Sequence, residues 1–379
     1  MENIKDLFYL APDVVFLNNA SFGACPKPVM DVYRDWQIEL ERQPVEFLGR
    51  RRETLLKYAR EELARFLNCA SDEIVFVTNA TTALNIVAHS IDLQPGDEVL
   101  TTDLEYGAMD RMWKIICERK GAVYRKVKTN FPLSNDEFVE NVFQNVHPKT
   151  KVLFLSHITS STALLFPVKQ MVQCANEMGI ITIIDGAHVP GQIPLDLADL
   201  APDFYTGNCH KWLFAPKGAA FFYARKNHQN LLKSFLISWG RKEFLSESPF
   251  IDEFEYQGTR DLAPFLSVPA GIEFHKKYFT DSAKHNIRQM LEYAKTEFAR
   301  IFDTKALIEY IPENMQMYAH PLPKDLDGKL LKIKLYDNYN IELPVSLQNN
   351  IEYIRISLQL FNTKDDLDYL FNKIQKLCN

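Results

Sequence analysis

The sequence predicts an α/β protein with a mostly parallel β-sheet that lies between layers of helices. Short apolar segments alternate with longer helical patterns through the first two thirds of the 379-residue chain. Several short segments are apolar on both faces, as parallel strands buried between helices are. Repeated alternation of strand and helix is typical of such a sheet. We expect strands over residues 73–78, 97–103, 151–158, 179–185 and 219–224.

Helices are expected between these strands, and two of them end at glycines. The segments Thr82–Ser90, Tyr106–Lys120 and Lys169–Met178 carry the helical pattern. Gly121 and Gly179 directly follow the second and third segments. A glycine just past the last turn ends a helix because it adopts a left-handed backbone conformation without strain.

The pattern changes after about residue 265, which indicates a second, smaller α+β domain. A long amphipathic stretch covers Val268–Phe302, and a last helix is expected over Lys364–Leu377. Between them, polar segments at 329–337 and 353–360 are interpreted as strands. The expected units are an N-terminal segment, a large domain and a small C-terminal domain, at residues 1–16, 17–265 and 266–379.

Composition and charge argue against several classes of protein. Hydrophobic residues make up 46% and charged residues 24% of the chain, which are ordinary globular values. The net charge is −6 without a basic run, so we expect no nucleic-acid and no membrane partner. Six scattered cysteines without a CxxC pair are typical of reduced thiols in the cytoplasm. We find no signal-peptide pattern and no apolar stretch long enough to span a membrane.

Two charged residues stand where chemistry is expected. Asp185 ends an apolar strand, and ligands of open α/β sheets bind beyond the carboxyl ends of strands. Its carboxylate could hold a metal, accept from a ribose, pair with a protonated ring nitrogen, or simply cap a helix. Lys211 lies among apolar residues, which lower the pKa of an amine and make it a nucleophile. Lys217 is the competing lysine, and its proline and glycine neighbours indicate a turn.

Two further segments suit a flat, phosphorylated ligand. In residues 78–85 a strand ends and hydroxyl residues open a helix, whose free N–H groups favour a phosphate. The alternative is simple N-capping by Asn79 or Thr81. Tyr106 follows another strand end, where its ring could stack on a flat cofactor or pack on the core.

Together these segments resemble the class V aminotransferase family of fold-type I enzymes, which use pyridoxal 5′-phosphate (PLP). Within the family, the isopenicillin N epimerase-like branch is the nearest match. The resemblance covers most of the chain, and the aspartate, HK and GTRD motifs in this order are specific. It rests on LNNASFGACP (17–26), TNATTALN (78–85), LEYGA (104–108), SHITSSTALLFP (156–167), DGAHVPGQIPLDL (185–197), HK (210–211), YQGTRD (256–261) and IRISLQLFNT (354–363).

The resemblance implies a role for each matching residue near the cofactor ring. Lys211 would hold PLP as a Schiff base and move protons at the substrate Cα. Asp185 would keep the ring nitrogen protonated, which makes the ring an electron sink. His188 would lie near the phenolic oxygen, and Tyr106 would stack on the ring. Ser160 would face the ring from a strand end.

The remaining implied roles concern the phosphate, the substrate and a second subunit. Contacts to the phosphate are implied for Thr81, Thr82 and Asn208, while His210 would brace the lysine. Thr259 would reach the phosphate of the partner subunit, which implies a homodimer with shared active sites. Arg355 would bind the substrate α-carboxylate with its forked guanidinium, the alternative being a surface pair on an edge strand. Asn18 and Asn19 would close over the substrate.

The sequence leaves the reaction open. Epimerase, racemase or aminotransferase chemistry at Cα is the leading hypothesis, and a carbon–sulfur β-lyase is the alternative. A desulfurase with a carrier cysteine is disfavoured, because no cysteine lies between Cys209 and Cys378. A PLP-binding protein without turnover is a further alternative, which the joint presence of Lys211, Asp185 and Arg355 argues against. Metal and nucleotide sites are disfavoured by the absence of HExxH, CxxC, GxGxxG and GxxxxGK[ST] patterns.

Overall fold

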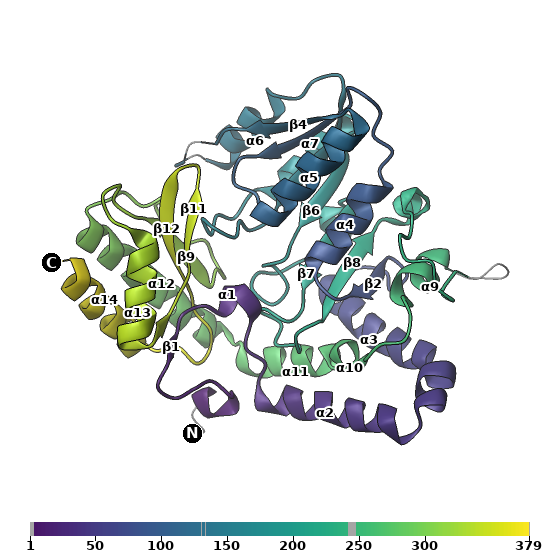
Figure 1. Ribbon diagram of the computed structural model, residues 1–379, viewed down its shortest axis with the longest axis horizontal. Coiled ribbons are helices and arrows are strands. Elements are labelled where there is room, and N and C mark those ends of the chain that lie inside the picture. The colour runs from purple at the N-terminus through teal and green to yellow at the C-terminus, as the bar shows by residue number, and fades with distance from the viewer. Residues whose placement is uncertain (1–3, 130, 133, 242–247, 379) are drawn as a thin grey trace.

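A seven-stranded sheet forms the centre of the larger part of the molecule (Figure 1). The computed structural model describes residues 4–129, 131–132, 134–241 and 248–378. Within this sheet only β8 runs antiparallel to its neighbours. The strand order is β2-β8-β7-β6-β5-β3-β4, with β2 at Ile74–Val77, β3 at Glu98–Thr102, β4 at Val123–Val127, β5 at Thr150–Ser156, β6 at Ile181–Asp185, β7 at Phe204–Asn208 and β8 at Ala220–Ala224.

Successive residues along each strand pack into different hydrophobic cores, one on each face of the sheet. Ile183 of β6 packs with α4 (Ala80–Ser90) and α5 (Gly107–Lys120). Ile184 packs on the other face, in the core that includes α7 (Val168–Glu177). Other helices of that second face include α2, α3 and α11, at Lys27–Arg42, Arg52–Leu67 and Val268–Tyr278. The predicted α/β fold class is therefore confirmed.

The two glycine stops are also present. Gly121 has a φ of 66° directly after α5, and its N–H donates hydrogen bonds to carbonyl oxygens of the last helical turn. Gly179 follows the end of α7 with φ of 68°. Both helices therefore end where the left-handed conformation begins, as the sequence predicts.

The C-terminal part packs a second core on a three-stranded antiparallel sheet of order β11-β12-β9. Its elements are α12 at Asp281–Phe302, β9 at Met317–Pro321, α13 at Gly328–Tyr339, β10 at Ile341–Glu342, β11 at Val345–Gln348, β12 at Ile351–Ser357 and α14 at Lys364–Cys378. The N-terminal strand β1 (Val15–Phe16) pairs with β10, so the chain start crosses to this part before α1 (Asn19–Phe22). Figure 1 shows α1 between the two sheets. The unit boundaries expected at residues 16 and 265 stay predictions.

The expectation of a strand at 329–337 is wrong, because this segment belongs to helix α13. The side chain of Asp327 accepts from the N–H of Leu330 and caps the helix. Leu331 and Leu335, one helical turn apart, are buried, whereas Ile333 is 45% exposed. The spacing of the buried residues is thus helical, and the alternation of Lys with apolar residues concealed it. Likewise, the stretch 268–302 is two helices, because Thr280 caps a new helix at Asp281.

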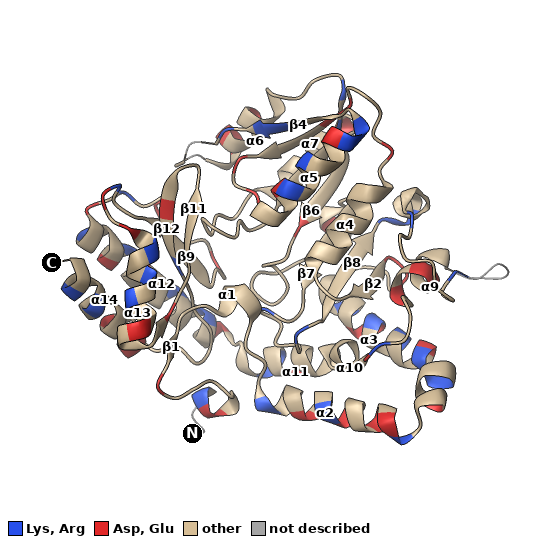
Figure 2. Cartoon of the chain, in the orientation of Figure 1, with Lys and Arg blue, Asp and Glu red and all other residues tan. Residues whose placement is uncertain are grey.

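Charged residues of both signs are interspersed on the outer helices. Figure 2 shows Lys and Arg beside Asp and Glu along α2, α3, α13 and α14. In the described part of the chain, no helix is both long and apolar enough to cross a membrane.

Candidate active site

A cavity of about 470 Å³ opens at the carboxyl ends of the central strands. The ends of β5, β6 and β7 contribute to its walls, together with α1, the start of α4, Tyr106 before α5, and β12. This is the edge at which open α/β sheets bind ligands, and the volume suits a small molecule. Nine of the thirteen predicted site residues line this cavity. Those that line it are Thr81, Tyr106, Ser160, Asp185, His188, Asn208, His210, Lys211 and Arg355.

Lys211 lies just after β7, and its side chain points into the cavity. Its Nζ is 3.4 Å from Nε2 of His188. Burial and then the charge of Arg355 lower the pKa of the Lys211 amine to about 7, although the carboxylate of Asp185 opposes this shift. An amine with such a pKa is largely unprotonated near neutral pH and is available as a nucleophile.

The backbone of Lys211 is held by the N-terminal segment. Its carbonyl oxygen accepts from Nδ2 of Asn19 at 3.2 Å. Gly23 presses against the same peptide, since a Cβ at this position would lie 1.9 Å from the carbonyl oxygen of His210. His210 itself is fixed by a contact of 3.0 Å between its Nδ1 and the carbonyl oxygen of Ala219. Asn19 therefore contacts the Lys211 peptide directly, whereas the bracing of Lys211 by His210 stays a prediction.

Asp185 is buried at the end of β6 and lines the same cavity as Lys211. Its Oδ1 accepts from the N–H of Ala187 at 2.9 Å, and no described residue donates to its Oδ2. Burial raises the pKa of this carboxyl, and the Ala187 N–H and the nearby Lys211 partly oppose the shift. A cationic group bound at Oδ2 would stabilise the ionised carboxylate.

His188 is buried beside Lys211 and is held neutral. Burial, followed by the charges of Lys211 and Arg355, lowers the pKa of its imidazole well below the usual value. Among the described residues its Nδ1 has no hydrogen-bond partner. A buried ring nitrogen without a partner is costly, so it marks a place for a polar ligand atom.

The start of α4 could bind an anion, although two of its N–H groups are already capped by asparagine side chains. Oδ1 of Asn79 accepts from the N–H of Thr82 at 2.9 Å, and Oδ1 of Asn208 accepts from the N–H of Ala80 at 3.0 Å. The N–H of Thr81, between them, has no acceptor among the described residues. The helix dipole and this open donor favour a phosphate. Asn79 can therefore cap the helix while the N–H of Thr81 stays available for an anion.

Arg355 is buried in β12, which is the central strand of its sheet. Its Nη1 donates to the carbonyl oxygen of Ser160 at 2.5 Å, and its Nη2 lies 3.4 Å from Oδ1 of Asn18 and 3.3 Å from Oγ of Ser21. Burial lowers its pKa to about 10, and no described carboxylate pairs with it. The alternative of a surface pair on an edge strand is therefore wrong. A buried guanidinium with only neutral partners suits an anionic ligand.

Four predicted site residues do not line the cavity. Asn18 and Asn19 stand behind it and position Arg355 and Lys211. The hydroxyl of Thr82 is engaged with Oδ1 of Asn79 and Oγ1 of Thr78. Thr259 lines a different cavity beside Arg260, so a role for it in catalysis requires a second copy of the chain.

Sequence reasoning missed several residues of the site. Ser21, Phe22, Asn79 and Ser156 line the cavity, and Phe22 is 72% exposed at its rim. Asn79 carried a capping signal, but the others had no local signal that distinguished them. Among the described residues, no group of three or more His, Cys, Asp or Glu is arranged to hold a metal ion.

The architecture is that of fold-type I PLP-dependent enzymes. Residues 15–370 match the family model of class V aminotransferases, and the chain belongs to this family. It is similar to an isopenicillin N epimerase from Amycolatopsis lactamdurans, with 32% identity over 99% of this chain and 98% of the relative. It is also similar to a probable chloroplastic L-cysteine desulfhydrase from Arabidopsis thaliana, with 27% identity over 97% and 83%. A solved cystine C–S lyase shares the fold with a TM-score of 0.85 at 20% identity, over 96% of this chain and 98% of that one.

Proposed function

We propose that this protein is a PLP-dependent enzyme that acts at the Cα of an amino acid, with Lys211 as the residue that holds the cofactor. The observation that carries the proposal is a lysine whose pKa is lowered to about 7, inside a cavity that also contains Asp185 and Arg355. The cavity fits PLP chemically, because it offers an open helix N–H at Thr81 and an unpartnered imidazole nitrogen at His188. When bound, PLP draws electrons from Cα of the attached amino acid, so that a bond to this carbon can break.

Each side chain then has a task that follows from its position. The free Oδ2 of Asp185 would accept a hydrogen bond from the ring nitrogen of PLP and favour its charged form. Arg355 binds the substrate carboxylate and so orients Cα. The ring of Tyr106, which lines the cavity, would pack against the cofactor ring. The amine of Lys211, which lies in the same cavity, would move the proton at Cα of the substrate.

The phosphate and the second subunit complete the proposal. Thr81 and the side-chain amide of Asn208 would bind the phosphate from this chain. Thr259 would bind it from the partner subunit in a homodimer, since its own side chain lies away from the cavity of this chain. The six cysteines are free thiols, which supports a cytoplasmic location.

Epimerase-like chemistry is the reaction that we favour, and it is supported by the 32% identical relative. The test is to incubate the enzyme with PLP and single-enantiomer amino acids in deuterated water. Deuterium at Cα together with the opposite enantiomer is expected for at least one amino acid. The Lys211→Ala variant serves as the matched control, because it keeps the cavity but lacks the amine. Absence of Cα exchange across a broad panel would contradict the proposal.

A carbon–sulfur β-lyase is the second candidate, and one structural observation favours it. No cysteine is among the described residues that line the cavity, and Cys209 is fully buried with a raised pKa. A lyase that releases sulfur from its substrate needs no carrier cysteine. Relatives named as desulfhydrase and C–S lyase support this reading. Release of pyruvate and ammonia, together with sulfide from cysteine or cysteine persulfide from cystine, without an enantiomer product, would favour it over the epimerase.

A further inference from the structure

The sheet opens between β3 and β5 as it approaches the cavity. The main-chain pairing of these strands ends at Leu100 and Leu153, whereas β5 and β6 stay paired as far as Ser156 and Asp185. Side chains bridge the gap from that point on. The hydroxyl of Thr101 donates to the carbonyl oxygen of Phe154 at 2.8 Å. The N–H of Ser156 therefore needs an acceptor that β3 no longer supplies.

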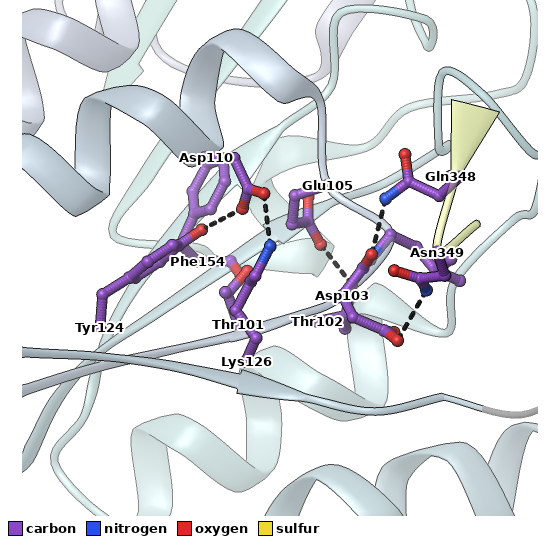
Figure 3. Close-up of polar contacts among 11 residues, drawn as sticks. Thr101, Thr102, Asp103, Glu105, Asp110, Tyr124, Lys126, Phe154, Gln348 and Asn349 are labelled. Carbon is purple, nitrogen blue, oxygen red and sulfur yellow. Dashed lines mark hydrogen bonds and ion pairs between the residues drawn. The ribbon is translucent and has the colours of Figure 1, made fainter. Parts of the chain in front are cut away.

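Glu105 supplies that acceptor with a fully buried carboxylate. Its Oε2 accepts from the N–H of Ser156 at 2.8 Å and from the Ser156 hydroxyl at 2.6 Å. Its Oε1 accepts from the hydroxyl of Thr102 at 2.7 Å. The side chain is 2% exposed, and no described cation pairs with it. Figure 3 shows Glu105 beside Thr102 and Asp103 in this polar network.

A buried carboxyl without a cation is an unfavourable way to join two strands. Burial raises the pKa of Glu105 to about 7, the bonds from Ser156 and Thr102 oppose this, and the charge of Asp185 adds to it. A main-chain ladder or a neutral side chain would close the same gap at lower cost. The position of the carboxyl therefore points to a role in the site beyond folding.

Glu105 connects two segments that line the cavity. Tyr106 is the next residue along the chain, and Ser156 is the register partner of Asp185. We propose that Glu105 is a positioning residue that fixes the spacing between the ring of Tyr106 and the carboxylate of Asp185, both of which would contact PLP. This inference rests on the proposed use of PLP.

The same segment has a second anchor, which lets the role of Glu105 be tested without unfolding the loop. Oδ1 of Asp103 accepts from the N–H of Thr129 at 3.0 Å, and its Oδ2 accepts from Nδ2 of Asn349 at 2.7 Å. Its carbonyl oxygen accepts from Nε2 of Gln348 at 2.6 Å (Figure 3). Loss of the Glu105 contacts should therefore leave the segment attached and change only its spacing.

The test compares Glu105→Gln with Glu98→Gln in the PLP-loaded and PLP-free protein. Glu98 is a matched control, because it is also 2% exposed, lies at the opposite end of β3, and accepts from the Thr150 hydroxyl and from Arg125. We expect Glu105→Gln to weaken PLP affinity about tenfold or more, as the loss of hydrogen bonds to a charged group does. The circular dichroism of bound PLP should change as well. Glu98→Gln should keep both properties and alter only thermal stability.

Two further variants keep the inference falsifiable. Glu105→Asp keeps the charge but shortens the side chain, and it should resemble Glu105→Gln because the contacts are lost. Thr102→Val removes one donor outside the cavity and should weaken PLP affinity about fivefold, as the loss of one hydrogen bond does. This variant decides the matter if Glu105→Gln does not fold. Wild-type affinity and dichroism in the folded variants, or an equal loss in Glu98→Gln, would overturn the inference. Failure of the wild type to bind PLP would instead overturn the proposed function.

Discussion

Replacing Arg355 with methionine should separate substrate binding from folding. Arg355 is 5% exposed, and it donates only to uncharged groups among the described residues. Two charge-assisted hydrogen bonds to a carboxylate contribute about 1.5–3 kcal/mol each. The variant should therefore lose at least about 3 kcal/mol of substrate binding, which corresponds to about a 100-fold increase in the dissociation constant.

The same change should have two other effects. The charge of Arg355 lowers the pKa of Lys211, so its removal should raise that pKa toward the usual value. The temperature of unfolding should change little, because the lost hydrogen bonds are offset by the removal of a buried charge without an anionic partner. A purely structural role for Arg355 would instead reduce stability without a specific effect on carboxylates.

The assay uses two titrations of the PLP-loaded protein, one with an amino acid and one with the matching amine that lacks the carboxylate. The change in visible absorption reports binding in both. We expect the loss of affinity for the amino acid alone. Arg300→Met is a matched control, since Arg300 lies on α12 and pairs with Glu297 at the surface. Wild-type affinity in Arg355→Met, or an equal loss for both ligands, would refute the assignment of Arg355.

Four further predictions concern the amine, the acid, the pH dependence and the C-terminal core. Lys211→Ala should stop deuterium uptake at Cα while circular dichroism in the far ultraviolet stays native; uptake at the wild-type rate would contradict its role. Asp185→Asn should slow the same uptake by at least about 100-fold, as the loss of an electrostatic partner at a reacting centre does, and an unchanged rate would exclude this role. The rate at which the cofactor-free protein binds PLP should rise with pH and reach half its maximum near pH 7. Burial and Arg355 lower the pKa of the Lys211 amine to about 7, and only the unprotonated amine reacts. A midpoint near the usual pKa of lysine would disagree with the structure. Leu335→Ala should destabilise the protein by about 2–5 kcal/mol in denaturant titrations without a change in substrate affinity, since Leu335 is fully buried in α13 far along the chain from Lys211.

Local patterns in the sequence predicted strands β2, β3, β5, β6 and β8 of the central sheet, but not β4 or β7. Asp185 and Tyr106 could be placed because a polar or aromatic residue after an apolar strand lies at the ligand edge of such a sheet. The same reasoning failed for 329–337, where apolar residues fit two periodicities and the Asp327 cap decided for a helix. Strand β4 escaped prediction as well, since it lies at an edge of the sheet and is largely exposed.

The second layer of the site could not be predicted from local patterns. Asn18 and Arg355 meet although 337 positions separate them in the chain. Asn19 was predicted to close over the substrate, but it lies behind the cavity and holds the Lys211 peptide, a task that only the folded chain reveals. Glu105 was overlooked because a glutamate beside a tyrosine gives no sign of burial; its environment is created by the separation of β3 from β5.

The most direct test is to reduce the PLP-loaded protein with borohydride and to locate the cofactor by peptide mass spectrometry. The expected result is one pyridoxyl group on the peptide that contains Lys211 and none on Lys217. The Nζ of Lys217 donates a hydrogen bond to the carbonyl oxygen of Gly23. A protein that stays unmodified under saturating PLP, or that carries the group on Lys217, would contradict the assignment of the nucleophilic amine to position 211.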